Sequence, residues 1–142
     1  MDLSEHLAGR TVEHLNKNRQ YGDRIRRVSR DCVDIFRIFF LFRCEEKSLD
    51  VIIDPPEEDL ETLKGHLEKI RTRKYWQNPS LALLKENRKK YRLFLKNPRI
   101  EKGENGHYHF RAEFISENKE DIFFSMLNYA VKPVLLYLRT KQ

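Results

Sequence analysis

The chain has 142 residues, a length that fits one domain with a core of its own. Hydrophobic residues make up 39% and charged residues 35%, and because the apolar residues recur at regular spacings, this composition excludes a disordered chain. The net charge is +6, no basic and apolar leader opens the chain, and no apolar run approaches the length of a membrane helix, so we expect a cytoplasmic protein without a membrane segment.

The first third of the chain predicts a helix followed by strands. Apolar residues at helical spacing predict a helix over residues 4–18, with Ser4 as its cap. Residues 24–31 are basic and fit neither pattern. Residues 32–43 are β-branched and aromatic on both faces, which predicts one central strand covered on both sides. Residues 48–54 alternate, and predict a second strand that forms a hairpin with the first.

The middle of the chain predicts two helices and a strand. Two prolines and two glutamates after Asp54 suit a helix start, and a leucine stripe continues that helix to about residue 73. A second helix is expected from Asn78, and a strand over residues 91–95. Residues 97–106 are rich in Asn, Pro and Gly, so they predict a loop.

The last third predicts a strand and a long helix. Residues 107–115 alternate between apolar and polar side chains, as a half-buried strand does. A helix is expected over residues 119–139, and Pro133 predicts a kink near residues 129–132. The fold class is therefore α+β: an antiparallel sheet with helices, in the order α-β-β-α-α-β-β-α, within one domain spanning residues 1–142. This order also fits two α-β-β-α units, a pseudo-repeat of the chain.

The two cysteines and the absence of common catalytic motifs indicate what kind of activity to expect. Cys32 and Cys44 are too few for a disulfide scaffold, and we expect both to be reduced residues of the core. The sequence has no Gly-rich phosphate loop, no Cys-x-x-Cys and no nucleophile elbow. We therefore expect no cofactor and a protein that is not an ordinary enzyme.

Positive charge is concentrated in one stretch of the chain. Residues 69–102 contain twelve Lys or Arg and two Glu, so this stretch carries +10 and the rest of the chain −4. Such asymmetry points to an acidic partner, and nucleic acid is the commonest one because binding releases its counterions. A solvated basic helix face without a partner is the alternative. The candidate nucleic-acid-binding residues are Arg71, Arg73, Lys74, Lys85, Arg88, Lys89 and Arg92.

The strand over residues 107–115 carries a possible metal site. His107 and His109 share one face, and Glu113 lies further along the same face, so the three are candidate metal ligands. His-Tyr-His resembles the histidine motif of the HUH endonucleases, which nick single-stranded DNA. The sequence Tyr129-Ala130-Val131-Lys132 is similar to that family's Tyr-x-x-Lys motif. The resemblance implies a divalent metal at the two histidines, attack by Tyr129, and Lys132 nearby. An ordinary half-exposed strand is the alternative.

The overall layout of helices and hairpins resembles the type III secretion chaperone-like fold. The sequence Leu83-Leu84-Lys85-Glu86-Asn87, the strand around Glu113 and the C-terminal helix have the layout of that fold's second half. The resemblance implies a non-enzymatic, often dimeric module that binds peptides. We therefore predict a non-enzymatic binding module with a basic face for nucleic acid or another acidic partner. The alternatives are a protein-binding adaptor or chaperone-like homodimer, and the metal-dependent nickase.

Overall fold

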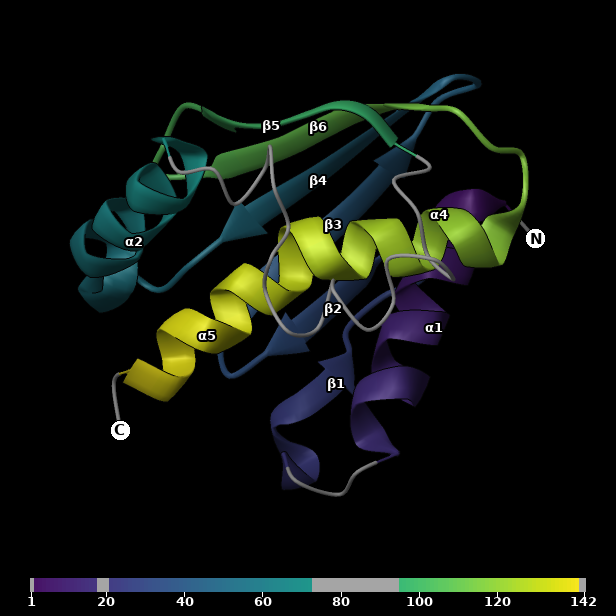
Figure 1. The fold of residues 1–142 in the computed structure, drawn as a ribbon. Helices are drawn as coiled ribbons and strands as arrows, with labels where there is room; N and C mark the ends of the chain where they lie inside the picture. Colours follow the sequence, from purple (N-terminus) through teal and green to yellow (C-terminus); the bar gives the residue numbers. More distant parts are fainter. Residues whose placement is uncertain (1, 18–20, 73–94, 141–142) are drawn as a thin grey trace.

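The computed structural model describes residues 2–17, 21–72 and 95–140, which form a six-stranded antiparallel sheet with helices (Figure 1). The order of the strands in the sheet is β1-β2-β3-β4-β6-β5. The fold class is therefore α+β, as the sequence predicts. In chain order the elements are α1 (Leu3–Asn16), β1 (Ile25–Arg27), β2 (Cys32–Ile35), β3 (Ile38–Cys44), β4 (Ser48–Asp54), α2 (Leu60–Thr72), β5 (Leu95–Lys102), β6 (Tyr108–Phe114), α4 (Lys119–Met126) and α5 (Lys132–Thr140).

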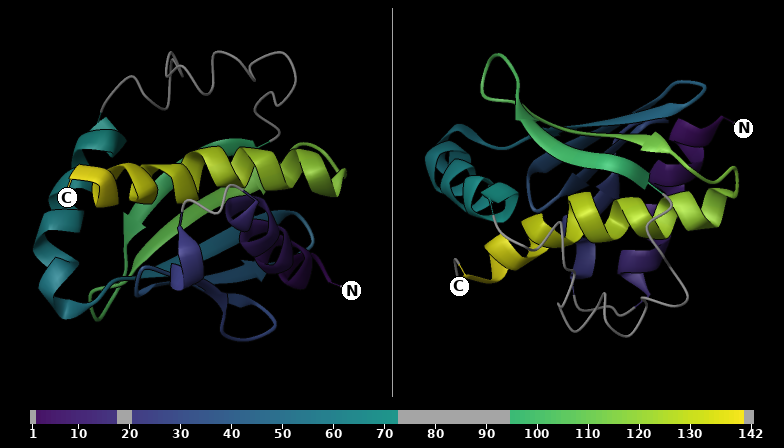
Figure 2. Two further views of the ribbon diagram at one scale, coloured as in Figure 1. Left: turned by 90° about the horizontal axis from the view of Figure 1, so that it is seen from below. Right: turned by 45° about the horizontal axis from the view of Figure 1, so that its top comes forward.

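The helices divide the sheet into a covered face and an open face. Helices α4 and α5 cross the sheet, α1 lies beside α4, and α2 lies at one end and contacts α5 (Figure 2). None of the helices in the described ranges lies on the opposite face, which we name the open face. Four strands precede α2 and two follow it in the described part of the chain, so the predicted order and pseudo-repeat stay unconfirmed.

The core lies between the helices and the covered face. Strand alternation sends Phe40 and Phe42 of β3 to this face, together with every second residue of β4 and β6. The register brings Val51 opposite Phe110, and both are fully buried. Each such large side chain stabilises the fold by about 1.5–3 kcal/mol on burial. The predicted alternation over residues 48–54 and 107–115 is confirmed.

The prediction of one strand over residues 32–43 was wrong. This stretch forms β2 and β3, joined by the two-residue turn Phe36-Arg37, whose φ angles are 53° and 72°. Such a turn needs positive φ at both positions, which Asn-Gly usually supplies, so the sequence lacked the usual hairpin signal. The stretch is not covered on both sides either, because Phe39 and Arg43 on β3 are exposed on the open face.

The predicted loop over residues 97–106 is largely strand. Strand β5 begins at Leu95 and pairs with β6 across an irregularity between Lys96 and Arg99. Asn97 has a φ of 53°, and Pro98 follows it. A proline can lie in a strand at a sheet edge or a bulge, and β5 offers both. Only the last four residues of the predicted loop, 103–106, lie in the turn to β6.

Two of the predicted helix features concern the start of α1 and the junction between α4 and α5. The cap of α1 is Asp2, whose Oδ1 accepts a hydrogen bond from the Glu5 amide at 2.9 Å, so the prediction of Ser4 as the cap was wrong. The Ser4 hydroxyl instead accepts from the Cys44 amide at 3.0 Å and ties α1 to β3. Between α4 and α5 the chain forms a π-helical segment, Leu127–Val131, just before Pro133. The sequence predicted a kink or a break near residues 129–132. The structure instead has a π-helical segment before this proline, which donates no backbone hydrogen bond.

Two further expectations concern the cysteines and the membrane. Cys32 and Cys44 are both free thiols and partly buried. Burial raises the pKa of Cys44 to about 11, so its thiol is a poor nucleophile at neutral pH. Within the described ranges, every helix is too short or too polar to cross a membrane.

Candidate functional site

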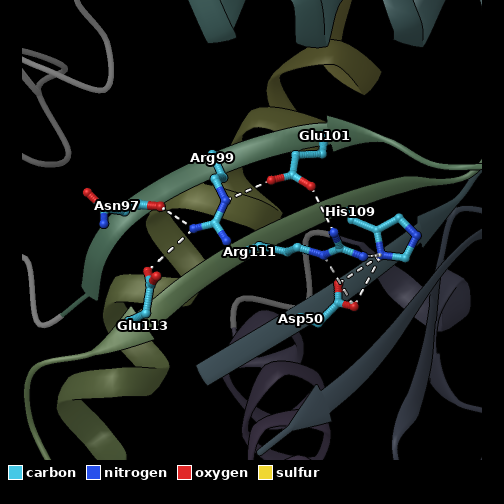
Figure 3. Close-up of polar contacts among 7 residues, drawn as sticks. All are labelled: Asp50, Asn97, Arg99, Glu101, His109, Arg111 and Glu113. Atoms are coloured by element: carbon cyan, nitrogen blue, oxygen red, sulfur yellow. Dashed lines mark hydrogen bonds and ion pairs between the residues drawn. The ribbon is translucent and has the colours of Figure 1, made fainter. Parts of the chain in front are cut away.

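The open face carries a network of charged side chains across three neighbouring strands. Asp50 comes from β4, His109, Arg111 and Glu113 from β6, and Arg99 and Glu101 from β5 (Figure 3). These residues alternate with the core residues of the same strands, so they lie side by side on the opposite side of the sheet. The network contains three acids, two arginines and one histidine.

The histidine of the network is held in place by an aspartate and a glycine. His109 Nδ1 lies 2.9 and 3.2 Å from the two Asp50 oxygens, and the imidazole side chain is 18% exposed. Because a carboxylate only accepts, a protonated Nδ1 satisfies this contact. On the other side, a Cβ at Gly103 would come within 2.6 Å of His109 Cδ2 and 2.7 Å of Nε2. A glycine in this turn therefore makes room for the ring.

The two arginines connect the acids. Arg111 Nη1 donates to Glu101 at 2.8 Å, and its Nε lies 3.6 Å from Asp50. Arg99 Nε donates to Glu101 at 2.7 Å, and its Nη1 lies 3.4 Å from Glu113. The Arg99 hydrogen bond, with the Arg111 charge nearby, lowers the pKa of Glu101. The network is thus compensated internally, and it links β4, β6 and β5 rather than offering free positive charge to a ligand.

The proposed metal ligands lie on the open face but are directed to different partners. His107 Nε2 is 3.3 Å from Asp54, His109 contacts Asp50, and Glu113 contacts Arg99. Over the described ranges, no group of three or more His, Cys, Asp or Glu residues has the arrangement to hold a metal ion. The structure therefore does not bring His107, His109 and Glu113 together as one ligand set.

The tyrosine and lysine of the nickase hypothesis lie on the other side of the sheet. Tyr129 is fully buried among the core residues, and its ring stacks on Phe110 with centroids 6.3 Å apart. Burial raises the pKa of Tyr129 to about 12 and lowers that of Lys132. Phe110 alternates with His109 along β6, so the sheet itself separates Tyr129 from the two histidines. No observation on the described residues favours the nickase.

The candidate nucleic-acid-binding residues fall mostly outside the described ranges. Arg71 lies in the last turns of α2, and Arg73, Lys74, Lys85, Arg88, Lys89 and Arg92 lie in the stretch 73–94, which is outside the described residues. Of the other basic residues in the charged stretch, Arg99 is paired with acids, and Lys102 has Lys64 of α2 as its neighbour. That neighbouring ammonium lowers the pKa of Lys102.

The residues that meet across β4 and β6 were not evident from the sequence. The pairing of Asp50 with His109 depends on the register of two strands that lie far apart in the chain. Alternating polar residues on each strand were the available signal, but they do not reveal which strands are neighbours. A group of arginines around Phe36 was also missed, because residues 24–31 fitted no pattern. The chain matches no protein-family model, no curated protein and no solved structure.

Proposed function

We propose that this protein is a non-enzymatic binding module that holds an acidic partner, nucleic acid, through the basic residues between Arg71 and Arg92. The proposal rests on where the excess charge lies. Residues 73–94 hold seven Lys or Arg and one Glu, out of totals of 28 and 22 in the whole chain. The remaining residues therefore carry 21 basic and 21 acidic side chains, and the whole net charge of the protein equals that of this stretch.

The contacts within the described residues support this reading. Basic side chains there are repeatedly paired with acids, as Arg10 is with Glu120, Arg30 with Glu5, and Arg111 with Glu101. Residues 73–94 contain a single acid, Glu86, beside seven basic residues, so few acids of the same stretch could pair with them. The same stretch holds Tyr75, Trp76 and Tyr91, and aromatic side chains among arginines and lysines can stack on bases.

The test measures how nucleic-acid binding depends on salt. Fluorescence anisotropy with labelled single-stranded DNA, duplex DNA and RNA should show affinity falling linearly with salt on logarithmic axes. We expect the variant K85Q/R88Q/K89Q/R92Q to bind roughly tenfold more weakly or worse. Its salt slope should also be reduced by up to about 0.9 for each phosphate that the variant no longer neutralises.

The control removes the same number of charges elsewhere. The variant K17Q/R43Q/K47Q/K119Q changes four exposed residues that form no ion pair with a described residue, and it should keep most of the affinity. Equal losses in both variants would mean that only net charge matters, and the assignment to residues 71–92 would be wrong. No binding to any nucleic acid at low salt would remove the proposal itself.

A second candidate, a homodimer that serves as a protein-binding adaptor, is favoured by apolar residues on the open face. Phe39 is 38% exposed there, and the partly buried Leu41 and Ile52 lie on the same side of the sheet. The face also carries both acids and bases, the mixture that a twofold contact between two copies of one patch needs. Light scattering should then give the mass of a dimer, and F39D should give a monomer. A monomeric wild-type chain at high concentration would end this candidate.

A further inference from the structure

A pocket lies at the β1–β2 end of the open face, beside the turn that joins β2 and β3. Its volume is about 330 Å³, near the lower end of the range of about 300–1,000 Å³ typical of small-ligand sites. Five residues line it, and three of them are arginines: Arg24, Arg26, Asp34, Phe36 and Arg37. The pocket is therefore small, rich in positive charge and lined in part by Phe36.

A buried aspartate holds two sides of this pocket together. Asp34 is only 5% exposed, and its Oδ1 accepts a hydrogen bond from the Arg37 backbone amide at 2.7 Å. Its Oδ2 accepts from Arg26 Nη2 at 2.9 Å. Because a guanidinium has five N–H donors, this bond orients Arg26 and leaves most of its donors for a ligand.

The other two arginines are held more weakly. The Arg24 guanidinium lies over the Phe36 ring at 5.3 Å, and among the described residues no carboxylate forms an ion pair with it. Arg37 lies 3.0 Å from Glu58, but its side chain is 75% exposed, and such surface pairs exchange readily with solvent and ligands. Taken with Asp34 and Glu58, the three arginines leave one positive charge in excess.

The backbone of the turn is a second and independent observation. Phe36 and Arg37 both have left-handed φ angles, which side chains with a Cβ disfavour and which Asn-Gly would adopt more easily. Both residues line the pocket. A strained conformation kept at the mouth of a pocket is characteristic of functional sites, because an easier turn would lose the two side chains that the pocket needs.

We infer that this pocket binds a phosphate group, carried either by a small phosphorylated molecule or by the backbone of a nucleic acid. Guanidinium groups match the charge and geometry of phosphate through paired hydrogen bonds. Phosphate offers more oxygens and more charge than a carboxylate, so it can engage several arginines at once. The inference goes beyond the proposed function, since it involves no residue of the stretch 73–94.

The test follows arginine Nε–H resonances of the full chain by NMR during titration with inorganic phosphate, adenosine 5′-monophosphate and a short single-stranded oligodeoxynucleotide. We expect Arg24, Arg26 and Arg37 to shift with phosphate. The variant R24Q/R37Q should weaken binding by about tenfold or more, as expected for charge-assisted hydrogen bonds. The matched control R43Q/K47Q removes the same charge from exposed positions and should stay within about twofold of wild type.

The titrations with the three ligands distinguish the two possible sources of the phosphate group. Competition between the oligonucleotide and inorganic phosphate at these resonances identifies a backbone phosphate, whereas binding of the mononucleotide without the oligonucleotide identifies a small molecule. Either result supports the site. Wild-type affinity in R24Q/R37Q, or succinate binding as well as phosphate, would overturn it. Oligonucleotide binding that persists in this variant and is lost in K85Q/R88Q/K89Q/R92Q would support the proposed function alone.

The variant R37G tests the pocket without disturbing the fold, because glycine adopts the turn conformation freely. We expect a Tm equal to or above that of wild type together with weaker phosphate binding. A Tm several degrees lower would contradict the proposed strain in the turn, and unchanged phosphate binding would contradict the pocket.

Discussion

The covered and open faces of the sheet are built from the same strands, yet different chemistry holds each one. On the covered face, Val51 and Phe110 meet with no exposure to solvent. On the open face, their sequence neighbours Asp50, His109 and Arg111 form hydrogen bonds and ion pairs that solvent can reach. Apolar burial stabilises without depending on direction, whereas partly exposed charges contribute little and depend on salt screening and pH. The covered face therefore provides most of the stability, and we expect the open face to contribute less.

The largest difference in stability is expected between variants at two neighbouring residues of β6 whose side chains lie on opposite faces of the sheet. Phe110→Ala should cost about 3–5 kcal/mol of the free energy of unfolding, because it opens a cavity against Val51 and Tyr129. Arg111→Gln, the next residue on the open face, should cost about 1 kcal/mol or less. Urea denaturation of both variants gives the two values. Similar costs would show that the open face carries a real share of the stability.

A smaller effect is expected where Gly103 lies against the His109 ring. Gly103→Ala places a methyl group against the His109 ring, which must move away from Asp50, and we expect a loss of about 1–3 kcal/mol. In a His109→Ala background the same change should cost less than about 0.5 kcal/mol. The control is Gly65→Ala on α2, where an added Cβ meets nothing within 4 Å. It should stabilise by up to about 1 kcal/mol. Equal costs in both backgrounds would refute the steric explanation.

The smallest effect concerns acid pH. Arg99 and Arg111 lower the pKa of Glu101 below its ordinary value of 4.5, so the unfolded chain binds this proton more readily than the folded one. The contribution of Glu101 to stability is therefore present above that ordinary value and is lost as the pH falls through the lowered one. The free energy of unfolding falls as the pH is lowered, and in Glu101→Gln this fall should be smaller than in wild type by less than about 1 kcal/mol. Denaturation curves from neutral to acid pH measure this, with the exposed Glu104→Gln as a control for the loss of one carboxylate.

Local patterns predicted the elements whose signals lie within a few residues. The alternation in β4 and β6 gave both the strands and the side of each that is buried, and Pro133 marked the interruption between α4 and α5. The turn at Phe36-Arg37 was missed because its residues are not those that usually adopt positive φ. The predicted loop at Asn97-Pro98 was wrong because breakers also occur at bulges in edge strands.

The candidate sites were harder to predict, since each is built from more than one strand of the sheet. The sequence placed His109 on the side of its strand that faces away from the core. Its partner Asp50 lies on β4, which is separated from β6 in the chain by α2, the stretch 73–94 and β5. The pocket around Phe36 is lined by residues from β1, β2 and the turn that follows β2, and its three arginines lie close together only when β1 and β2 are paired. Sequence spacing describes faces of single elements, and a site made by several elements appears only in the assembled sheet.

The two outermost strands limit how this protein can associate. Strand β1 has only three residues, and β5 is interrupted by a bulge that contains a proline. Short, irregular and proline-containing margins discourage the addition of a further strand from another molecule. The described edges of the sheet are therefore poor templates for a continuous ladder of strands between copies of this chain.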